Sequence, residues 1–336
     1  MDITVVLPSF YVQQFGELVE DLGGDFKTCL ASANLEPAVL KAPLAHFTLA
    51  ECKQVALTAC TQTQQPALGL LLGERLLVHT HGVLGYAALN ASTLAEALAV
   101  LEQFIRVRVT VAQLSLQQTD NNAQLVLLAD APLGLWERFL SEAVLMAVKQ
   151  IVDFITQDKR AVTAVAFRYP VEEQAELAEK ILGCPVLYEQ PWTGLNINPE
   201  FLHKPLQVAE PAMFEVAQRL CAEALSELNE EESLSQRIRR YLLARHNEFP
   251  GLEVICRQFH ITPRTLHRHL QEENTTFRAI TDEVKHQLAL QHLKEHSLKE
   301  AAYLLGYSDL ANFRRAFKRW EGVSPTEYLQ RLAENE

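Results

Sequence analysis

Apolar residues recur every three or four positions over much of residues 8–106, which is the spacing of helices that bury one side. Thr48 precedes one of these apolar stretches and Ser92 precedes another. Both residue types cap helix N-termini, because their hydroxyl groups accept hydrogen bonds from free backbone N–H groups. The pattern therefore predicts a mainly helical region in which two helices begin near Thr48 and Ser92.

A shorter period follows over residues 109–118, where apolar and polar residues come closer to alternating, and a second apolar run covers 125–128. Residues 120–122, which lie between these runs, are Asp, Asn and Asn, and such residues favour turns. Two runs of this kind joined by a turn predict a β-hairpin.

Helical and strand patterns then alternate along the chain. We expect a helix over 135–155, a strand over 162–167, a helix over 171–182 and a short strand over 185–188. This mixed layout predicts an α+β fold for an N-terminal domain that covers residues 1–228.

The last helix of this domain, expected over 211–228, carries one narrow apolar seam. The seam consists of Phe214, Ala217, Cys221, Ala224 and Leu228. Two interpretations are open: the seam packs against its own domain, or it forms the contact of a homodimer. The acidic run that follows predicts a linker over residues 229–233.

The C-terminal domain, residues 234–336, is expected to be all-α. Ser233 and Gln236 fit a capping box at the start of its first helix. A short amphipathic helix follows from residue 252, then a turn at residues 260–261, and Thr262 can cap a second helix whose first residue is Pro263. These signals predict a helix-turn-helix motif over about 252–273.

The second helix of this motif has one apolar and one polar side. Leu266 and Leu270 fall on the side expected to face the core. The opposite side carries hydrogen-bond donors at positions i, i+3, i+4 and i+7, namely Arg264, His267, Arg268 and Gln271. Such donors can pair with base edges or phosphates in a DNA groove. The alternative is an ordinary solvated helix face, although such faces usually mix both signs of charge.

The same pattern occurs a second time, about 46 residues later. Phe313 and Phe317 then take the core positions, and the polar side carries Ala311, Arg314, Arg315 and Lys318. This repeat predicts a second helix-turn-helix motif over about 298–320. A helix over 277–294 between the motifs would span about 27 Å, against the roughly 34 Å that separates successive major grooves on one face of DNA. One chain could then read two grooves.

The charge distribution agrees with two domains that have different tasks. The 336-residue chain has a net charge of −12. Residues 1–232 hold 14 Lys and Arg against 29 Asp and Glu, whereas residues 233–336 hold 16 against 13, together with seven of the eleven His. A DNA-binding face on such a protein must be a local basic surface.

Signals for other functions are weak. The chain has no GxSxG, GxxxxGK[ST] or HExxH pattern, so we expect no catalytic residues and no cofactor. His79 and His81 have no third ligand at a suitable spacing, so we expect no metal site. The six Cys without a CxxC pair, the absence of a basic N-terminal region and the absence of an apolar run of about 18 residues predict a cytoplasmic protein without a membrane segment.

Several motifs resemble those of one known family. Residues 234–332, and especially 301–308, 313–320 and 322–325, closely resemble the AraC/XylS family of bacterial transcription regulators. The acidic part is similar to the arabinose-binding-like N-terminal sensing domain of one branch of that family, which includes ornithine-utilisation and virulence regulators. The residues that carry this second similarity are 68–74, 82–87, 93–98, 167–170 and 183–186.

This resemblance implies an N-terminal domain that binds a small effector or self-associates, and a C-terminal domain that binds promoter DNA and recruits RNA polymerase as an activator. The candidate DNA-contacting residues are Arg264, Thr265, His267, Arg268, Gln271, Leu310, Ala311, Arg314, Arg315 and Lys318. Leu310 and Ala311 are apolar where the family often has polar base readers, which leaves contact with a thymine methyl group. Arg314, Arg315 and Lys318 suit phosphates better than bases.

Two other classes of function stay open at this stage. One is a helical interaction protein that binds a partner protein without DNA, and the other is a metabolite-processing enzyme with a regulatory helical appendage. The N-terminal domain is rich in Leu, Ala and Val. These residues would suit a pocket for an apolar ligand, but a packed core has the same composition, so the sequence nominates no ligand residues.

Overall fold

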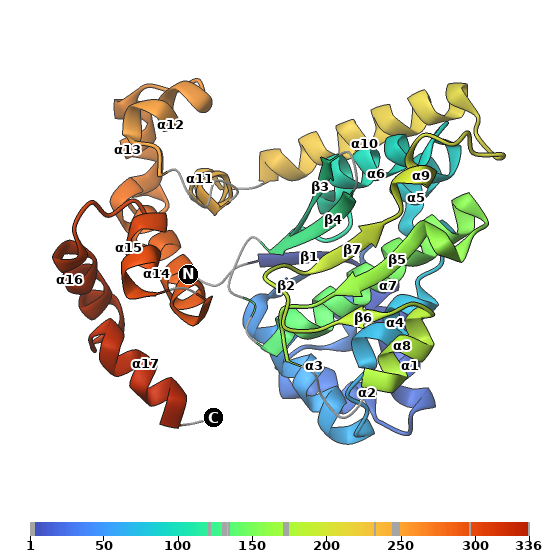
Figure 1. Cartoon of the computed structure of the whole chain (residues 1–336), viewed down its shortest axis with the longest axis horizontal. Helices are drawn as coiled ribbons and strands as arrows, with labels where there is room; N and C mark the ends of the chain where they lie inside the picture. Colours follow the sequence, from blue (N-terminus) through green and yellow to red (C-terminus); the bar gives the residue numbers. More distant parts are fainter. Residues whose placement is uncertain are drawn as a thin grey trace. The chain divides into compact units, whose positions relative to one another are not determined.

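The computed structural model describes residues 4–119, 122–129, 133, 135–170, 175–231, 233–243, 249–295 and 297–334. The chain divides into two compact units, residues 1–227 and residues 228–336, and each has its own hydrophobic core (Figure 1). The first unit combines helices with two sheets, whereas every element of the described part of the second unit is a helix. The expected fold class is therefore confirmed.

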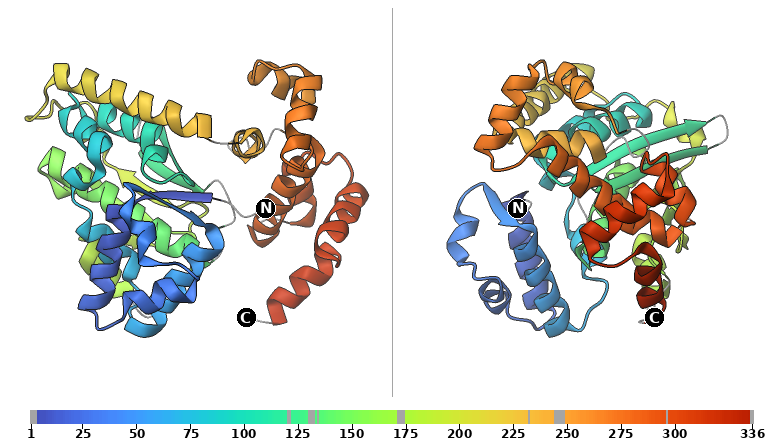
Figure 2. Two further views of the ribbon diagram at one scale, coloured as in Figure 1. Left: turned by 180° about the vertical axis from the view of Figure 1, so that it is seen from behind. Right: turned by 90° about the vertical axis from the view of Figure 1, so that its left-hand side faces the viewer.

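The larger sheet of the first unit has five strands in the order β3-β4-β7-β5-β6. Its strands are β3 (Ala112–Thr119), β4 (Asn122–Ala129), β5 (Val162–Ala166), β6 (Val186–Leu187) and β7 (Gly194–Ile197). All neighbours are antiparallel except β5 and β6. The predicted hairpin is present as β3 and β4, which lie side by side in Figure 2. β7 was not predicted, because four residues are too few to establish an alternating pattern.

The long helix α7 (Leu135–Thr156) packs against the sheet and against α4 (Leu68–Arg75). Two glycines of α4 allow this close approach. A Cβ atom at Gly69 would lie 2.5 Å from the backbone oxygen of Phe139, and one at Gly73 would lie 2.6 Å from that of Ala143. The backbones of the two helices can therefore approach closely only where α4 has no side chain.

A second, two-stranded sheet pairs β1 (Thr4–Pro8) with β2 (Leu44–Thr48). The expectation of a mainly helical region over 8–106 did not include β2. The helices around it are α1 (Ser9–Asp21), α2 (Phe26–Ser32) and α3 (Leu49–Thr63), which Figure 2 shows in blue with β1 and β2 in one lobe of the unit. The remaining elements of the first unit, apart from α10, are η1 (Pro37–Lys41), η2 (Val78–His81), α5 (Gly82–Asn90), α6 (Leu94–Phe104), η3 (Ile105–Val107), η4 (Lys159–Ala161), α8 (Ala175–Leu182) and α9 (Pro199–Leu202).

The helix caps show at which residues two of the expected helices begin. Thr48 forms a full capping box with Glu51 at the start of α3, as predicted. The cap of α6 is Thr93 and not Ser92, because the Thr93 hydroxyl accepts the backbone N–H of Glu96 while the Ser92 N–H donates to the Glu96 carboxylate. The expected helix over 171–182 is α8 from residue 175 onward, and residues 171–174 lie outside the described part of the chain.

The apolar seam of α10 (Pro211–Glu231) lies partly within the core of the first unit. Phe214, Ala217 and Cys221 are buried in the core of the first unit. These three residues of the seam therefore pack against their own domain, whereas Ala224 and Leu228 are half-buried. The expected linker over 229–233 begins within this helix, which continues to Glu231, and residue 232 lies outside the described part.

The second unit is built around α14 (Phe277–Glu295), which contacts α11, α15, α16 and α17. The helices of this unit are α11 (Leu234–Leu243), α12 (Leu252–Gln258), α13 (Pro263–Glu272), α15 (Leu298–Leu304), α16 (Leu310–Glu321) and α17 (Pro325–Glu334). The pair α12–α13 precedes α14 in the chain and the pair α15–α16 follows it (Figure 1). The structure therefore contains two helix-turn-helix motifs joined by one long helix, as the repeat predicts.

Candidate nucleic-acid interface and small-molecule cavity

The first helix-turn-helix motif is held by a short core and a helix cap. Ile255 and Cys256 of α12 are buried in the core of the second unit. The Thr262 hydroxyl accepts the backbone N–H of Thr265 at 3.2 Å, and Pro263 is the first residue of α13. The cap fixes where α13 begins, and thereby fixes which of its residues face solvent.

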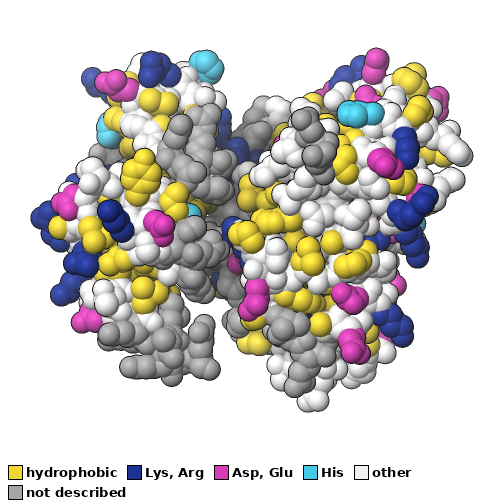
Figure 3. Space-filling model, in the orientation of Figure 1, with side chains coloured by type: hydrophobic (Ala, Val, Ile, Leu, Met, Phe, Trp, Pro, Cys, Tyr) yellow, Lys and Arg dark blue, Asp and Glu magenta, His cyan; other side chains and the backbone are white. Residues whose placement is uncertain are grey.

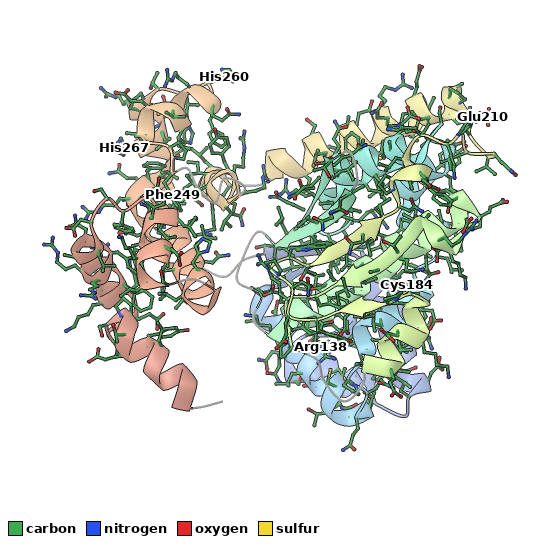
Figure 4. All side chains as sticks on the ribbon, viewed as in Figure 1. Arg138, Cys184, Glu210, Phe249, His260 and His267 are labelled. Carbon is green, nitrogen blue, oxygen red and sulfur yellow. The ribbon has the colours of Figure 1, made fainter. Side chains whose placement is uncertain are left out.

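The polar side of α13 faces solvent along its length. Leu266 and Leu270 are fully buried. Opposite them, the first stripe consists of four exposed side chains, those of Arg264, His267, Arg268 and Gln271. Thr265 is half-buried beside the cap, where its hydroxyl lies 2.9 Å from that of Thr262. Figure 4 shows His267 at the surface of the motif.

The helix α16 repeats this arrangement with aromatic residues in the core positions. Phe313 and Phe317 are fully buried. The second stripe consists of the exposed side chains of Ala311, Arg314, Arg315 and Lys318. Figure 3 shows Lys and Arg side chains gathered on the second unit over α16. The predicted donors of both stripes are therefore accessible.

The start of α16 differs from that of α13. The cap is Asp309, whose carboxylate accepts the backbone N–H of Ala311 at 2.8 Å. Leu310 is half-buried and packs against the core of the second unit. Its side chain is therefore partly committed to the fold, whereas Ala311 is free to approach a ligand with its methyl group.

The turns of the two motifs lie at equivalent positions of the repeat. His260 has φ +53° and Gly306 has φ +73°, and the two residues are 46 positions apart. Both turns thus require a left-handed backbone conformation, which glycine adopts without strain and histidine adopts at a cost. The predicted repeat rests on its apolar positions and does not include this pairing of Gly306 with His260.

The Arg side chains of the stripes have only weak intramolecular partners. Arg268 Nε lies 3.8 Å from Glu272 Oε1, and both side chains are more than 60% exposed. Arg315 donates to the Asn312 side-chain oxygen at 2.7 Å. Exposed contacts of this kind contribute about 1 kcal/mol or less, so both guanidinium groups can turn to a polyanion.

Contacts of α14 connect the two motifs. Lys285 Nζ lies 4.5 Å from the ring centroid of Phe249, which precedes α12, and 4.5 Å from that of Tyr307, in the turn before α16. Burial lowers the pKa of Lys285. His286 Nε2 also lies 2.6 Å from Glu321 Oε1 at the end of α16. These contacts attach the second motif, and the segment before the first motif, to the same helix.

The first unit contains a partly open cavity of about 120 Å³. Most of its lining residues come from α1, α3, α7 and the turns before α5 and β3, and other elements contribute single residues such as Leu72 of α4 and Leu101 of α6. The lining is mainly Leu, Val, Ala, Ile and Phe. For comparison, an engineered apolar cavity of about 150 Å³ binds benzene. The polar side chains at this cavity include Tyr11, His81 and Arg108. None of the three was predicted as a ligand residue, because they lie far apart in the chain.

His81 is a neutral hydrogen-bonding group at pH 7. Its Nε2 lies 3.1 Å from the Leu76 carbonyl oxygen, which can only accept, so Nε2 carries the proton. Its Nδ1 then accepts the Tyr11 hydroxyl at 2.5 Å. Burial, followed by the charge of Arg108, lowers the pKa of His81 to about 4, and burial raises the pKa of Tyr11. His79, by contrast, is exposed.

Arg108 is half-buried and lies over the Tyr11 ring, with 5.1 Å between the guanidinium carbon and the ring centroid. Its Nε donates to the Tyr11 hydroxyl oxygen at 3.3 Å, and one Nη donates to the Thr80 carbonyl oxygen at 3.1 Å. No ion pair between described residues involves Arg108. Within the described chain, no three His, Cys, Asp or Glu residues cluster as metal ligands would.

No helix of the described residues is both long enough and apolar enough to cross a bilayer.

Two family models match the chain. Residues 23–206 match the arabinose-binding domain of AraC transcription regulator, N-terminal, and residues 255–331 match a helix-turn-helix domain. The cavity lies within the first unit, which contains the first match, and both stripes lie within the second match.

Individual proteins are similar over most of the chain. The Ornithine utilization regulator of Pseudomonas aeruginosa is 34% identical over 327 residues, which cover 97% of this chain and 96% of that protein. The HTH-type transcriptional regulator VqsM of the same species is 27% identical over 271 residues, which cover 77% of this chain and 82% of that protein. The crystal structure of the transcriptional regulator CdpR, also from Pseudomonas aeruginosa, matches 91% of this chain and 96% of its own with 24% identity and a TM-score of 0.44.

The relatives named above are transcription regulators, and the first of them matches the chain through both units. The chain belongs to the AraC family of transcription regulators, with an N-terminal ligand-binding domain and a C-terminal helix-turn-helix domain.

Proposed function

We propose that the second unit binds promoter DNA by placing α13 and α16 in successive major grooves of one duplex. The observation that carries this proposal is the pair of capped helices in one compact unit, each with an exposed stripe of basic donors. The carboxylate beside the first stripe, that of Glu272, makes only a weak contact with Arg268 at 3.8 Å. The length of α14, 19 residues or about 28 Å, also suits the spacing of successive grooves.

The two stripes have different proposed roles. Arg264, His267, Arg268 and Gln271 read base edges, because long donors on an exposed helix face reach the groove floor. Thr265 contacts the DNA backbone beside the helix cap.

On α16, Arg314, Arg315 and Lys318 hold phosphates. Ala311 contacts a thymine methyl group, and the partly packed Leu310 supports that contact.

The first unit controls this binding through a small-molecule effector. An effector changes DNA occupancy only if it binds one arrangement or oligomeric state of the protein more tightly than another. A coupling free energy of about 1 to 3 kcal/mol is enough for a clear switch. The cavity and its three polar side chains support this part of the proposal.

We also propose that the protein is an activator that recruits RNA polymerase in the cytoplasm, and that it binds its effector without transforming it. The similarity to proteins named as regulators supports this view. A reporter placed behind a bound promoter should lose expression when the gene for this protein is deleted. A rise in expression would indicate repression instead.

Homodimerisation through residues 211–228 stays a prediction, and the buried seam restricts it. A dimer contact on α10 would use its outer side, where Val216 is 38% exposed and Leu220 is 42% exposed. Light scattering of the full chain should show a dimer that Leu220→Glu converts to a monomer. A monomeric wild type, or a dimer that tolerates the substitution, would contradict this contact.

The DNA proposal is tested by selecting bound sequences from random duplex DNA with the full chain, with and without a cell metabolite extract. We expect one enriched motif with two conserved segments about one helical turn apart. Affinity for it should fall steeply between about 50 and 200 mM salt. Failure to enrich any motif, or binding that is insensitive to salt, would favour a protein partner over DNA.

A further inference from the structure

The cavity of the first unit is almost wholly apolar, yet it contains one permanent positive charge. Arg108 lines the cavity, and among the described residues that line it none is an Asp or a Glu. His81 is uncharged at pH 7, because its pKa is near 4. The formal charge that a ligand meets there is therefore +1.

A positive charge beside apolar walls favours a negatively charged partner. The half-buried guanidinium group has lost part of its hydration, and the partners that replace it, the Tyr11 hydroxyl and the Thr80 carbonyl oxygen, are neutral. A ligand carboxylate would supply the missing counter-ion, and the planar guanidinium matches its two oxygens. Apolar walls in turn favour the burial of a hydrocarbon body.

We propose that the effector is an amphipathic monocarboxylate whose carboxylate pairs with Arg108 and whose apolar body lies between α1, α3 and α7. This inference rests on the proposed function, because it names the chemical class of the effector. The cavity volume of about 120 Å³ suits a body about the size of an aromatic ring or a short alkyl chain.

The same geometry disfavours two other classes of ligand. A sugar brings several hydroxyl groups, but the Tyr11 hydroxyl and His81 already bond to each other, so many sugar hydroxyls would lose their hydrogen bonds to water. A cationic amino acid such as ornithine would bring an ammonium group into a site whose described lining residues include Arg108 and no carboxylate.

Tyr11 and His81 are positioning residues for Arg108. The proton on His81 Nε2 is held by Leu76, which leaves Nδ1 to accept the Tyr11 hydroxyl proton. The Tyr11 oxygen can then accept from Arg108 Nε, which holds the guanidinium group at the cavity. The charge of Arg108 also acts on the Cys221 thiol of α10, whose pKa burial raises to about 11. A ligand bound to Arg108 would therefore act beside the helix that leads to the second unit.

The test compares three ligands that share an eight-carbon chain: octanoate, octanol and octylamine, titrated into the full chain by isothermal calorimetry. A second carboxylate, 3-phenylpropanoate, tests an aromatic body. We expect both carboxylates to bind about 10- to 100-fold more tightly than octanol, which is the range for a charge-assisted hydrogen bond, and octylamine to bind most weakly.

The variant Arg108→Gln should reduce octanoate affinity to the level of octanol and leave octanol affinity unchanged. The matched control is Arg106→Gln, which removes a cation two residues away that does not line the cavity, and which should retain octanoate binding. Ala147→Leu, which fills part of the cavity, should weaken octanoate and octanol together. Circular dichroism melting of each variant shows whether it is folded.

Three results would overturn the inference: no binding of either carboxylate, equal affinity for octanoate and octanol, or unchanged octanoate affinity in folded Arg108→Gln. If Arg108→Gln does not fold, the wild type alone still tests the inference. Equal affinity of the wild type for octylamine and octanoate would then overturn it. Binding of the same preparations to the selected duplex is measured by fluorescence anisotropy. Loss of ligand binding with intact DNA binding refutes only this inference, whereas ligand binding without DNA binding refutes the proposed function.

Discussion

The two regions of this protein that face ligands are built in opposite ways. The stripes of the second unit lie on exposed faces of single helices, where a cap and a 3.6-residue period determine which side chains reach solvent. The cavity of the first unit is lined from at least five elements and from residues as far apart as Leu7 and Ile151. A surface that belongs to one helix can be predicted from its sequence, whereas a cavity depends on how distant segments pack.

The largest expected effect is a loss of stability of the first unit on acidification. Unfolded histidine binds a proton near pH 6.5, whereas His81 binds one only near pH 4, so the unfolded chain binds more protons between these values. Stability of the first unit should therefore fall as pH drops from 6.5 to 4, by on the order of 3 kcal/mol.

Calorimetric unfolding of the full chain at several pH values measures this effect. The control is His81→Gln, which cannot titrate and should show a smaller pH dependence of the transition that belongs to the first unit. Identical pH profiles for the wild type and His81→Gln would show that this buried imidazole does not govern the acid sensitivity of the cavity.

The next largest effect concerns the first stripe. Arg268→Ala should weaken binding to the selected duplex by about 1 to 3 kcal/mol and relax the preference at one base pair, because a guanidinium group pairs bidentately with guanine. Fluorescence anisotropy with single-base variants of the duplex measures both. The matched control is Arg278→Ala, which removes an exposed cation from α14 outside both stripes. An equal loss of affinity for every duplex would reduce Arg268 to a phosphate contact.

A smaller effect distinguishes the turns of the two motifs. Gly306→Ala should destabilise the second motif by about 1 kcal/mol, because its φ of +73° strains any residue with a Cβ atom. His260→Gly relieves the corresponding strain in the first motif, but it also raises the conformational entropy of the unfolded chain. The free energy of unfolding should therefore rise by only about 0.5 kcal/mol. Urea unfolding of both variants checks the opposite signs, and a stabilising Gly306→Ala would contradict the proposed equivalence of the turns.

The smallest effect concerns the second stripe. Arg315→Ala should weaken binding to all duplexes alike and reduce the slope of log affinity against log salt by about 1. The loss of affinity between about 50 and 200 mM salt should then be about four-fold smaller than in the wild type. Anisotropy at three salt concentrations measures this slope. A selective loss at one base pair would show that Arg315 reads sequence.

Local signals account for what the sequence predicts well. The stripes, the capping box at Thr48 and the cap at Thr262 each depend on residues within one or two helical turns, and the structure contains them all. The accessibility of the stripe residues was therefore predictable, whereas their contacts with DNA stay a prediction.

Non-local packing accounts for what the sequence missed. The short strand β7 exists because β4 and β5 lie on either side of it, and β2 exists because it pairs with β1. The side of α10 that is buried was likewise decided by the core beneath it. His81 looked like an ordinary polar residue, because its partners Tyr11 and Arg108 are 70 and 27 positions away.

Hydroxyl-radical footprinting of the full chain on its selected duplex tests the central claim most directly. If α13 and α16 of one chain occupy successive major grooves, two protected segments should appear on one face of the DNA, with centres about 10 base pairs apart. Arg268→Ala should weaken protection over the segment that contains its base pair. A single protected segment, or two segments that Arg268→Ala and Arg315→Ala leave unchanged, would contradict recognition by the two stripes.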